Sequence, residues 1–367
     1  MSAAAVIDRL VVTTGGTGGH IFPALAVAAE LRRRNPGAKV LFLGAHGPEG
    51  DLARRAGLDF HALPASGVLG MGLKALLGSV WVGRGTILAL RVLRRFLPQA
   101  VIGFGGYAGF CPVLAAAMLR IPCAVHEQNS VAGVTNRILS RFVRKVFVSF
   151  DDRLGLFPPA KVQRTGNPVR AEIASAAKAS GTGRNLLVLG GSQGAKALND
   201  AVIAALPRLI EARVSILHQA GKADEARVKQ AYALAGADPD CVRGFMDDMA
   251  GAYAWADLAL CRAGASTIFE LAATGTPAIL VPFPFAAHNH QHVNAKHLAD
   301  LGAALLTEQD ALTPGLLADQ AQALLGDAAR LSAMGRAARS FAMPDAAARI
   351  VDGLESLCSA SKPGAKE

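Results

Sequence analysis

Short hydrophobic runs recur along the chain, and most of them end in a glycine-rich or polar turn. The first, "RLVVTT" at residues 9–14, leads through a glycine loop into residues 21–35, where apolar positions have helical spacing and the last turn is basic. Comparable runs lie at 39–44, 100–106, 122–129, 145–150, 185–190, 214–221, 258–264 and 277–284. Because these runs show no polar alternation, they predict parallel strands in sheets that helices cover on both faces.

The two halves of the chain open in the same way. In each half a strand, a glycine turn (residues 15–18 and 190–193) and a helix follow one another. The Gly/Pro-containing stretch 164–170 separates the halves, and residues 344–357 predict a final amphipathic helix. We therefore predict two α/β domains, residues 1–166 and 167–342.

The composition of the chain restricts the classes of function that it can have. The chain has 367 residues, of which 51% are hydrophobic, and its formal net charge is +10, which favours anionic partners. Aromatic residues make up only 5%, and no nucleic-acid-binding motif is evident, so we expect no nucleic-acid partner. The five cysteines form no C-x-x-C pair, which argues against a zinc site or a disulfide framework and favours a reducing compartment. The longest apolar stretch, 108–125, is broken by two prolines and an arginine, so we expect a cytoplasmic protein, peripheral at most to a membrane.

The glycine turns are suited to phosphate, because a helix N-terminus presents unpaired N–H groups and partial positive charge. The first loop lacks the third glycine of the dinucleotide fingerprint, since Ile21 stands there, and neither loop has the Gly-Lys-Ser/Thr of the P-loop. Ordinary tight turns of a doubly wound sheet remain the structural alternative.

Residues 261–284 form the most informative local stretch. A strand ends near Cys261, a loop of small residues follows, and a helix is expected to start near Ser266. Its backbone could hold a diphosphate, with Glu270 bound to two ribose hydroxyls. Alternatively, Thr267 and Glu270 form a capping box and Glu270 only stabilises its own helix.

The motifs together resemble the MurG family of glycosyltransferases of bacterial cell-wall synthesis. The resemblance covers about residues 10–357 through "TGGTGGHIFPALAVA", "GFGGYAGFCPVLAA", "HEQNSVAGVTNR", "TGNPVR", "LGGSQGA", "CRAGASTIFEL" and "VPFPFAAHNHQHVNA". It implies the GT-B fold, with two Rossmann-like domains that face a cleft and a final helix, 343–359, that crosses back to the first domain. It also implies transfer of N-acetylglucosamine from UDP-N-acetylglucosamine to the C4 hydroxyl of lipid I, which gives lipid II for peptidoglycan.

The resemblance assigns the donor site mainly to the second domain. Glu270 is expected at the ribose, Gln291 at the sugar, and the backbone of Met246 at the uracil. The other residues implied in donor binding are Thr17, Gly18, Gly19, Asn129, Arg170, Ser192, Gly264, Ala265, Ser266 and Thr267.

The first domain is expected to hold the acceptor and the general base. His20 is the only titratable residue of the first glycine loop, and an imidazole can take a proton from a sugar hydroxyl near neutral pH. Glu127 is the alternative base. Gly16, Tyr107 and His126 are expected at the acceptor, and His126 also remains a candidate base; a structural role for His20 is the other alternative.

The chemistry implied is one inverting displacement with UDP as the leaving group. Helix dipoles, loop amides and Arg170 can stabilise the departing diphosphate, so we expect no cofactor and no fixed metal. We expect no Asp-x-Asp triplet in the chain, and the aspartate pairs at 151–152 and 247–248 are interpreted as solvated turns.

Residues 73–97 carry two apolar stripes with basic neighbours, and we expect a break at 83–85 between them. The first stripe is predicted to dock on anionic phospholipids, while the second is predicted to pack on the sheet. The docking face comprises Leu73, Lys74, Leu76, Leu77, Val80, Trp81 and Arg84.

Two other interpretations remain open. One is a different GT-B enzyme, such as a UDP-N-acetylglucosamine 2-epimerase; the other is a nucleotide-binding regulator without catalysis. Other proteins of cell-wall synthesis are possible partners.

Overall fold

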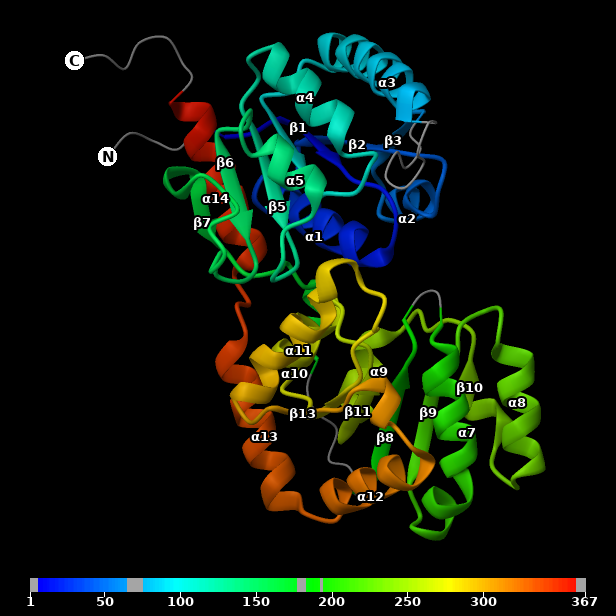
Figure 1. The fold of residues 1–367 in the computed structure, drawn as a ribbon. Coiled ribbons are helices and arrows are strands. Elements are labelled where there is room, and N and C mark those ends of the chain that lie inside the picture. The colour runs from blue at the N-terminus through cyan, green and yellow to red at the C-terminus, as the bar shows by residue number, and fades with distance from the viewer. Residues whose placement is uncertain (1–5, 65–74, 177–182, 192–193, 361–367) are drawn as a thin grey trace. The chain divides into compact units, whose positions relative to one another are not determined.

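The computed structural model of the chain describes residues 6–64, 75–176, 183–191 and 194–360, without the side chains of 75–81. The chain divides into two compact units: the first comprises Met1–Arg170 and Met343–Glu367, the second Ala171–Ala342 (Figure 1). The expected boundary lay after residue 166.

A seven-stranded parallel sheet forms the centre of the first unit, in the order β3-β2-β1-β4-β5-β6-β7. The strands are β1 (Arg9–Thr13), β2 (Lys39–Gly44), β3 (Asp59–Ala62), β4 (Ala100–Gly103), β5 (Cys123–Glu127), β6 (Lys145–Val148) and β7 (Val162–Arg164). The direction in which strands are added reverses between β1 and β4. Ligands of such sheets bind beyond the carboxyl ends of the strands at this switch point.

Helices cover both faces of this sheet, as the apolar runs predicted. They are α1 (Gly18–Arg34), α2 (Glu49–Arg55), α3 (Ala75–Phe96), α4 (Phe110–Met118), α5 (Val134–Leu139) and α14 (Ala346–Ser359). Side chains of α1, α2 and α14 share a core with Leu10 and Val12 of β1. Side chains of α3, α4 and α5 share another with Val11, which points to the opposite face.

Helix α3 is continuous from Ala75 to Phe96, so the predicted break at 83–85 is wrong. A Cβ on Gly85 would lie 2.9 Å from Sγ of Cys111 in α4, which is tighter than side-chain packing allows. Gly85 therefore permits close packing of α3 against α4 instead of ending the helix. Farther along α3, Ala89 and Leu93 are fully buried in the core, which confirms the packing predicted for the second stripe.

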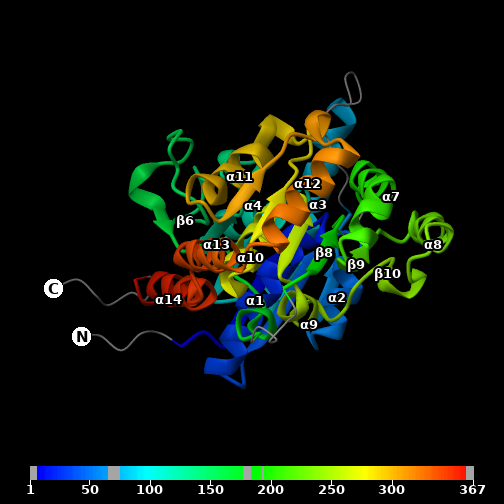
Figure 2. The same cartoon turned by 90° about the horizontal axis from the view of Figure 1, so that it is seen from below.

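The C-terminal helix α14 packs along α1 (Figure 2). Ile350, Val351 and Leu354 are fully buried there. Each such side chain stabilises the fold by about 1.5–3 kcal/mol relative to an exposed one. Helix α14 is thereby part of the first unit, although it follows the second unit in the sequence.

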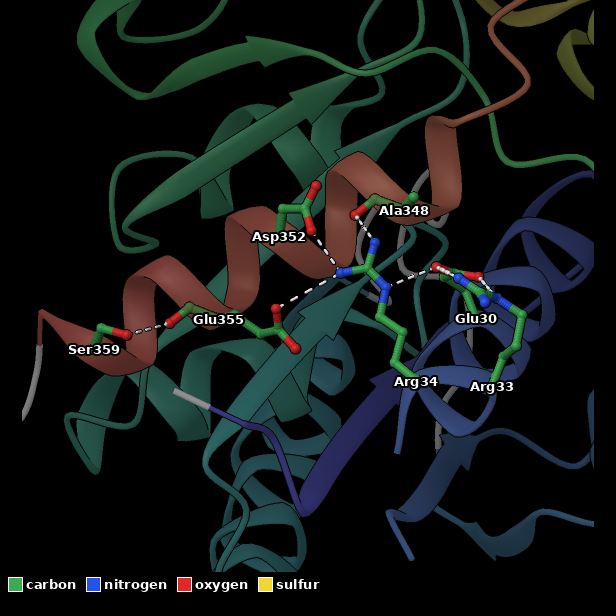
Figure 3. Close-up of polar contacts among 7 residues, drawn as sticks. All are labelled: Glu30, Arg33, Arg34, Ala348, Asp352, Glu355 and Ser359. Atoms are coloured by element: carbon green, nitrogen blue, oxygen red, sulfur yellow. Dashed lines mark hydrogen bonds and ion pairs between the residues drawn. The ribbon is translucent and has the colours of Figure 1, made fainter. Parts of the chain in front are cut away.

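Arg34, the last residue of α1, bridges the two helices (Figure 3). Its guanidinium donates to Asp352 at 2.5 Å, to the carbonyl oxygen of Ala348 at 3.1 Å and, within α1, to Glu30 at 2.7 Å. Glu355 lies 3.6 Å away, and burial raises the pKa of its carboxyl group. Arg34 therefore interacts with three carboxylates at this junction, one from α1 and two from α14.

Replacing Arg34 with methionine is expected to lower the free energy of unfolding by about 1–3 kcal/mol, because charge-assisted hydrogen bonds between α1 and α14 are lost while the apolar stem is kept. Chemical denaturation followed by circular dichroism measures the change. Arg33→Met is the control, because Arg33 is exposed and its ion pair, among the described residues, is with Glu30 of its own helix. Equal stability of both variants would contradict the role given to Arg34.

The second unit repeats the plan with a six-stranded parallel sheet in the order β10-β9-β8-β11-β12-β13. The strands are β8 (Asn185–Leu189), β9 (Ser215–Gln219), β10 (Val242–Arg243), β11 (Leu258–Cys261), β12 (Ala278–Leu280) and β13 (Ala304–Leu306). The helices are α6 (Ala171–Ala174), α7 (Lys196–Glu211), α8 (Glu225–Leu234), α9 (Met249–Trp255), α10 (Ala265–Thr274), α11 (His290–Asp300), α12 (Pro314–Leu325) and α13 (Ala328–Phe341). The order reverses between β8 and β11, and the loop after β11 leads directly to Gly264 and the start of α10, where several of the candidate donor residues lie.

Candidate active site

The first glycine loop connects β1 to α1. The strand ends at Thr13, the helix begins at Gly18, and Thr17 is the N-cap in an extended conformation. Gly16 has a φ of 114°, which strongly favours glycine. The predicted succession of strand, loop and helix is confirmed, and it places residues 18–20 in the first turn of α1.

The loop after β4 packs directly on the first glycine loop. A Cβ on Gly106 would overlap the carbonyl oxygen of Gly15, and a Cβ on Gly15 would overlap the side chain of Ala108. Gly106 also has a φ of 71°. The two loops therefore meet backbone against backbone at the switch point, and the neighbouring Tyr107 is 43% exposed.

His20 is half-buried where these loops meet the end of β5. Its Nδ1 lies 2.8 Å from Oε1 of Gln128, the residue after β5. A Cβ on Gly105 would stand 3.7 Å from the imidazole, so this glycine leaves ordinary contact distance to the ring. The structure thus brings His20 together with the "HEQN" segment, which is far away in the sequence.

His126 is fully buried in β5, and both ring nitrogens have protein partners. Nε2 lies 3.0 Å from the carbonyl oxygen of Gly166, and Nδ1 lies 3.0 Å from Nε2 of Gln128. Burial lowers the pKa of His126 to about 4. The expectation that His126 contacts the acceptor does not fit this enclosure, and a ring whose lone pair already accepts a hydrogen bond is a poor base.

Glu127 is also buried, at 3% exposure. Its carboxylate accepts hydrogen bonds from the backbone N–H of Asn129 at 3.0 Å and of Gly133 at 3.0 Å, and from Nδ2 of Asn136 at 2.9 Å. These donors occupy acceptor positions on both carboxylate oxygens and fix the side chain in place. Glu127 therefore organises the loop after β5, and the geometry favours His20 over it as the base.

Arg170 is the last residue of the first segment of the first unit, and its positive charge lies beside α1. Its guanidinium carbon lies 4.4 Å from the ring centre of Phe22, a cation–π distance. Asn129 is half-buried in the loop after β5. Both residues thus lie in the first unit, with the glycine loop.

In the second unit, the glycine loop after β8 includes Gly191, with a φ of 78°, whose carbonyl oxygen accepts a hydrogen bond from Gln219 at 3.1 Å. Ser192 lies outside the described residues, so its expected contact with the nucleotide stays a prediction.

Helix α10 begins directly after the loop that follows β11. Gly264, which has no side chain, is its N-cap, and Ala265 is its first residue. Thr267 therefore lies inside the helix, and the alternative that Thr267 and Glu270 form a capping box is wrong. The side chain of Glu270, 9% exposed, instead accepts a hydrogen bond at Oε2 from the hydroxyl of Tyr253 at 2.9 Å.

Gln291, near the start of α11, ties two loops of this unit together. Its Oε1 accepts from the backbone N–H of Phe283 at 3.0 Å and of Ala263 at 3.3 Å. Its Nε2 makes no hydrogen bond to any described residue, so two donors remain for a ligand. Met246, after β10, has a buried side chain and can offer only backbone groups.

The expectation that the chain contains no Asp-x-Asp triplet is wrong, because residues 238–240 form one. Oδ1 of Asp238 accepts from the backbone N–H of Asp240 at 2.8 Å and caps a short turn. Asp248, from one of the adjacent pairs, caps α9 through Gly251 at 2.8 Å. In the part of the chain that the structure describes, no three His, Cys, Asp or Glu residues gather in a group that could hold a metal.

The predicted docking face falls partly outside the described residues, which exclude Leu73 and Lys74. Leu76, Leu77, Val80 and Trp81 belong to α3, where only the backbone is described, and Arg84 is exposed. Among the described helices, none is both long and apolar enough to cross a bilayer.

Three residues in contact with the candidate site were not singled out from the sequence: Gln128, Tyr253 and Asn136. Gln128 lies inside the quoted "HEQN" motif, and this position could have identified it as a site residue from the sequence. Tyr253 lies 17 residues before Glu270, and nothing in the sequence pattern relates the two.

Comparison with known proteins places the whole chain in one family. Residues 10–148 match the model of the glycosyltransferase family 28 N-terminal domain, and residues 185–350 match that of its C-terminal domain. A UDP-N-acetylglucosamine–N-acetylmuramyl-(pentapeptide) pyrophosphoryl-undecaprenol N-acetylglucosamine transferase from Solidesulfovibrio magneticus is 56% identical, over 95% of this chain and 97% of its own.

Solved structures agree with this placement. The crystal structure of Acinetobacter baumannii MurG has a TM-score of 0.74 and 35% identity, covering 95% of this chain and 99% of that one. A putative UDP-N-acetylglucosamine 2-epimerase from Listeria monocytogenes has a TM-score of 0.69, over 97% of this chain and 98% of its own. Because it is only 12% identical, this likeness shows a shared fold and nothing more. The predicted GT-B fold, built from two Rossmann-like α/β units, is thereby confirmed. The chain belongs to the MurG family of glycosyltransferases.

Proposed function

We propose that this chain transfers N-acetylglucosamine from UDP-N-acetylglucosamine to lipid I and so forms lipid II in peptidoglycan synthesis. The observation that carries the proposal is the 56% identity, over 95% of the chain, to a transferase named for that donor and that acceptor. The chain is accordingly a UDP-N-acetylglucosamine-dependent N-acetylglucosaminyltransferase.

The second unit binds the donor in this proposal. The first turn of α10, residues 265–267, offers backbone N–H groups to the diphosphate. Glu270, held by Tyr253, accepts hydrogen bonds from the ribose hydroxyls, and the unbonded amide nitrogen of Gln291 donates to the sugar. The backbone of Met246 contacts the uracil, and Ser192 adds a contact from the second glycine loop.

In the first unit His20 is the general base. Its imidazole takes the proton of the C4 hydroxyl of muramic acid while the oxygen attacks C1 of the donor sugar. The bond from C1 to the diphosphate oxygen breaks, its electron pair leaves with UDP, and the α-linked donor gives a β-linked product. Gly16–Gly19 and Tyr107 contact the acceptor or the transferred sugar, and Asn129 reaches the donor.

Charge on the leaving UDP is stabilised by the N-terminus of α10 and by Arg170, without a bound metal. We therefore expect transfer to continue in excess EDTA at no less than about half the rate measured without it. The assay follows release of UDP from protein purified without added divalent ions. Loss of activity in EDTA that magnesium or manganese restores would contradict this expectation.

We further propose that α3 docks on anionic phospholipids at the inner face of the plasma membrane, where a lipid-linked acceptor lies. The described part of α3 exposes Arg84, Arg91, Arg94 and Arg95 around Ile87, which is 53% exposed. Each basic residue near an anionic surface contributes about 1 kcal/mol to binding. The apolar positions 76, 77, 80 and 81 precede this basic group on the same continuous helix.

Combining Leu76→Glu with Trp81→Glu is expected to abolish binding to vesicles that contain phosphatidylglycerol and to lower activity on full-length lipid I at least tenfold, because carboxylates replace apolar contacts. Activity on a short-chain, water-soluble acceptor should remain. Leu234→Glu is the control, since Leu234 is 83% exposed in the second unit. Unfolding of the double variant, or vesicle binding at the original affinity, would show that the docking assignment is wrong.

The transferase and the epimerase differ in what they require. A transferase releases UDP in proportion to added lipid I analogue, whereas an epimerase converts UDP-N-acetylglucosamine without any acceptor. Chromatography of the nucleotides with and without acceptor separates the two. Acceptor-independent formation of UDP-N-acetylmannosamine would overturn the proposal, and binding without turnover in either case would identify a regulator.

A further inference from the structure

We infer that Gln128 and His126 are positioning residues that hold His20 in a single tautomer, with its hydrogen on Nδ1 and a lone pair on Nε2. The side chains of His126, Gln128 and His20 form one line of hydrogen bonds. It begins at the carbonyl oxygen of Gly166 and ends at the imidazole of His20. The tautomer follows from the hydrogen bonds themselves. Its effect on catalysis rests on the proposed function, in which His20 is the general base.

The direction of the line is fixed at its buried end. A backbone carbonyl oxygen only accepts, so Nε2 of His126, 3.0 Å from that of Gly166, must carry a hydrogen. Because burial keeps the pKa of His126 at about 4, the ring is neutral near pH 7 and has only this one N–H. Its Nδ1 is therefore an acceptor.

The acceptor at Nδ1 of His126 determines how the carboxamide of Gln128 is turned. The group 3.0 Å from this nitrogen must donate, so it is the NH₂ of Gln128. The same NH₂ lies 3.2 Å from the carbonyl oxygen of His126, which also can only accept. Two independent acceptors thus require the same orientation, with Oε1 of Gln128 directed at His20.

The carboxamide oxygen then selects the tautomer of His20. Oε1 of Gln128, 2.8 Å from Nδ1 of His20, only accepts, so Nδ1 carries the hydrogen. A neutral imidazole has one N–H, and its lone pair is left on Nε2. Among the residues that the structure describes, Nε2 has no hydrogen-bond partner, so the line ends in an available base.

Packing holds the line in place. The rings of Phe104 and His126 lie 5.4 Å apart between centres, and Gln128 is 1% exposed. Water therefore has little access to the two inner members of the line. Without the line, the imidazole could carry its hydrogen on either nitrogen, and one of those two forms has no lone pair on Nε2.

Nuclear magnetic resonance of protein labelled with ¹⁵N in its nine histidines tests the inference directly. The signals of His20 are those that disappear in His20→Ala. We expect a protonated, pyrrole-type Nδ1 and an unprotonated, pyridine-type Nε2 in the neutral ring of the full-length protein. A protonated Nε2 or an even mixture of tautomers would overturn the inference.

Gln128→Met removes the oxygen and the NH₂ at nearly constant volume, and we expect the Nε2-protonated form of His20 to appear in its spectrum. The kcat for transfer should fall about 10–100-fold with the KM for UDP-N-acetylglucosamine unchanged, because only the base is affected. Gln99→Met is the matched control. Gln99 also makes three hydrogen bonds through its amide, at the opposite end of β1, and its replacement should alter neither the tautomer nor kcat.

The two measurements separate the inference from the proposed function. An Nδ1-protonated His20 that becomes mixed in Gln128→Met supports the inference, even if His20→Ala keeps its kcat and the base must be sought elsewhere. An unchanged tautomer in a folded Gln128→Met variant contradicts it, whatever the activity. If that variant does not fold, the spectrum of the unaltered protein alone decides.

Discussion

Replacing His20 with alanine is expected to lower kcat for transfer by about 10²–10⁴-fold, the usual contribution of a positioned general base. The Kd for UDP should change less than twofold, because His20 lies in the first unit and the proposed nucleotide contacts lie mainly in the second. Steady-state kinetics with a water-soluble lipid I analogue measures the first quantity, and calorimetric titration with UDP measures the second.

His61→Ala is the control for this change, since His61 is an exposed histidine on the edge strand β3 of the same unit. An ordinary kcat for His20→Ala with an unaltered dependence on pH would remove His20 as the base. Glu127 would then be the candidate to test, although backbone and side-chain donors already hold its carboxylate.

Replacing Glu270 with alanine is expected to weaken UDP binding at least tenfold and to raise the KM for the donor to a similar extent. A hydrogen bond to a charged group contributes about 1.5–3 kcal/mol, and 1.4 kcal/mol corresponds to a factor of ten. Tyr253→Phe, which removes the hydroxyl that holds Oε2 of Glu270, should produce a smaller loss in the same direction.

Glu211→Ala serves as the matched control, because Glu211 is an exposed glutamate at the end of α7 in the same unit. If Glu270→Ala binds UDP normally but unfolds at a lower temperature, Glu270 and Tyr253 form only a structural contact. The ribose assignment would then have to be abandoned.

Long apolar runs made most of the fold predictable. The run 39–44 is β2 at its full predicted length, and both strand–loop–helix units are present. The short edge strands β3, β7, β10 and β13 were not predicted, because two to four residues carry too little pattern to identify a strand. The prediction of a helix break at 83–85 is wrong, because the sequence alone does not distinguish a glycine at a close helix contact from a glycine at a helix end.

The segments that form the candidate site could be predicted from the sequence, but the contacts between their side chains could not. The glycine loops and the "HEQN" segment were identified, yet which of their side chains face a ligand depends on tertiary contacts. His126 and Glu127 looked as reactive as His20 in the sequence, while the structure buries both among protein partners. Tyr253 contacts Glu270 and Gln128 contacts His20, so each is linked to the site through another side chain. A local sequence pattern does not identify residues of this kind.

The central claim is best tested by incubating the purified chain with UDP-N-acetylglucosamine, labelled in the sugar, and lipid I in detergent. The account predicts that the label moves to lipid I, β-linked at the C4 hydroxyl of its muramic acid, with one UDP released for each sugar transferred. Label that stays on the nucleotide, as the unchanged donor or as its 2-epimer, while lipid I remains unmodified would contradict the account.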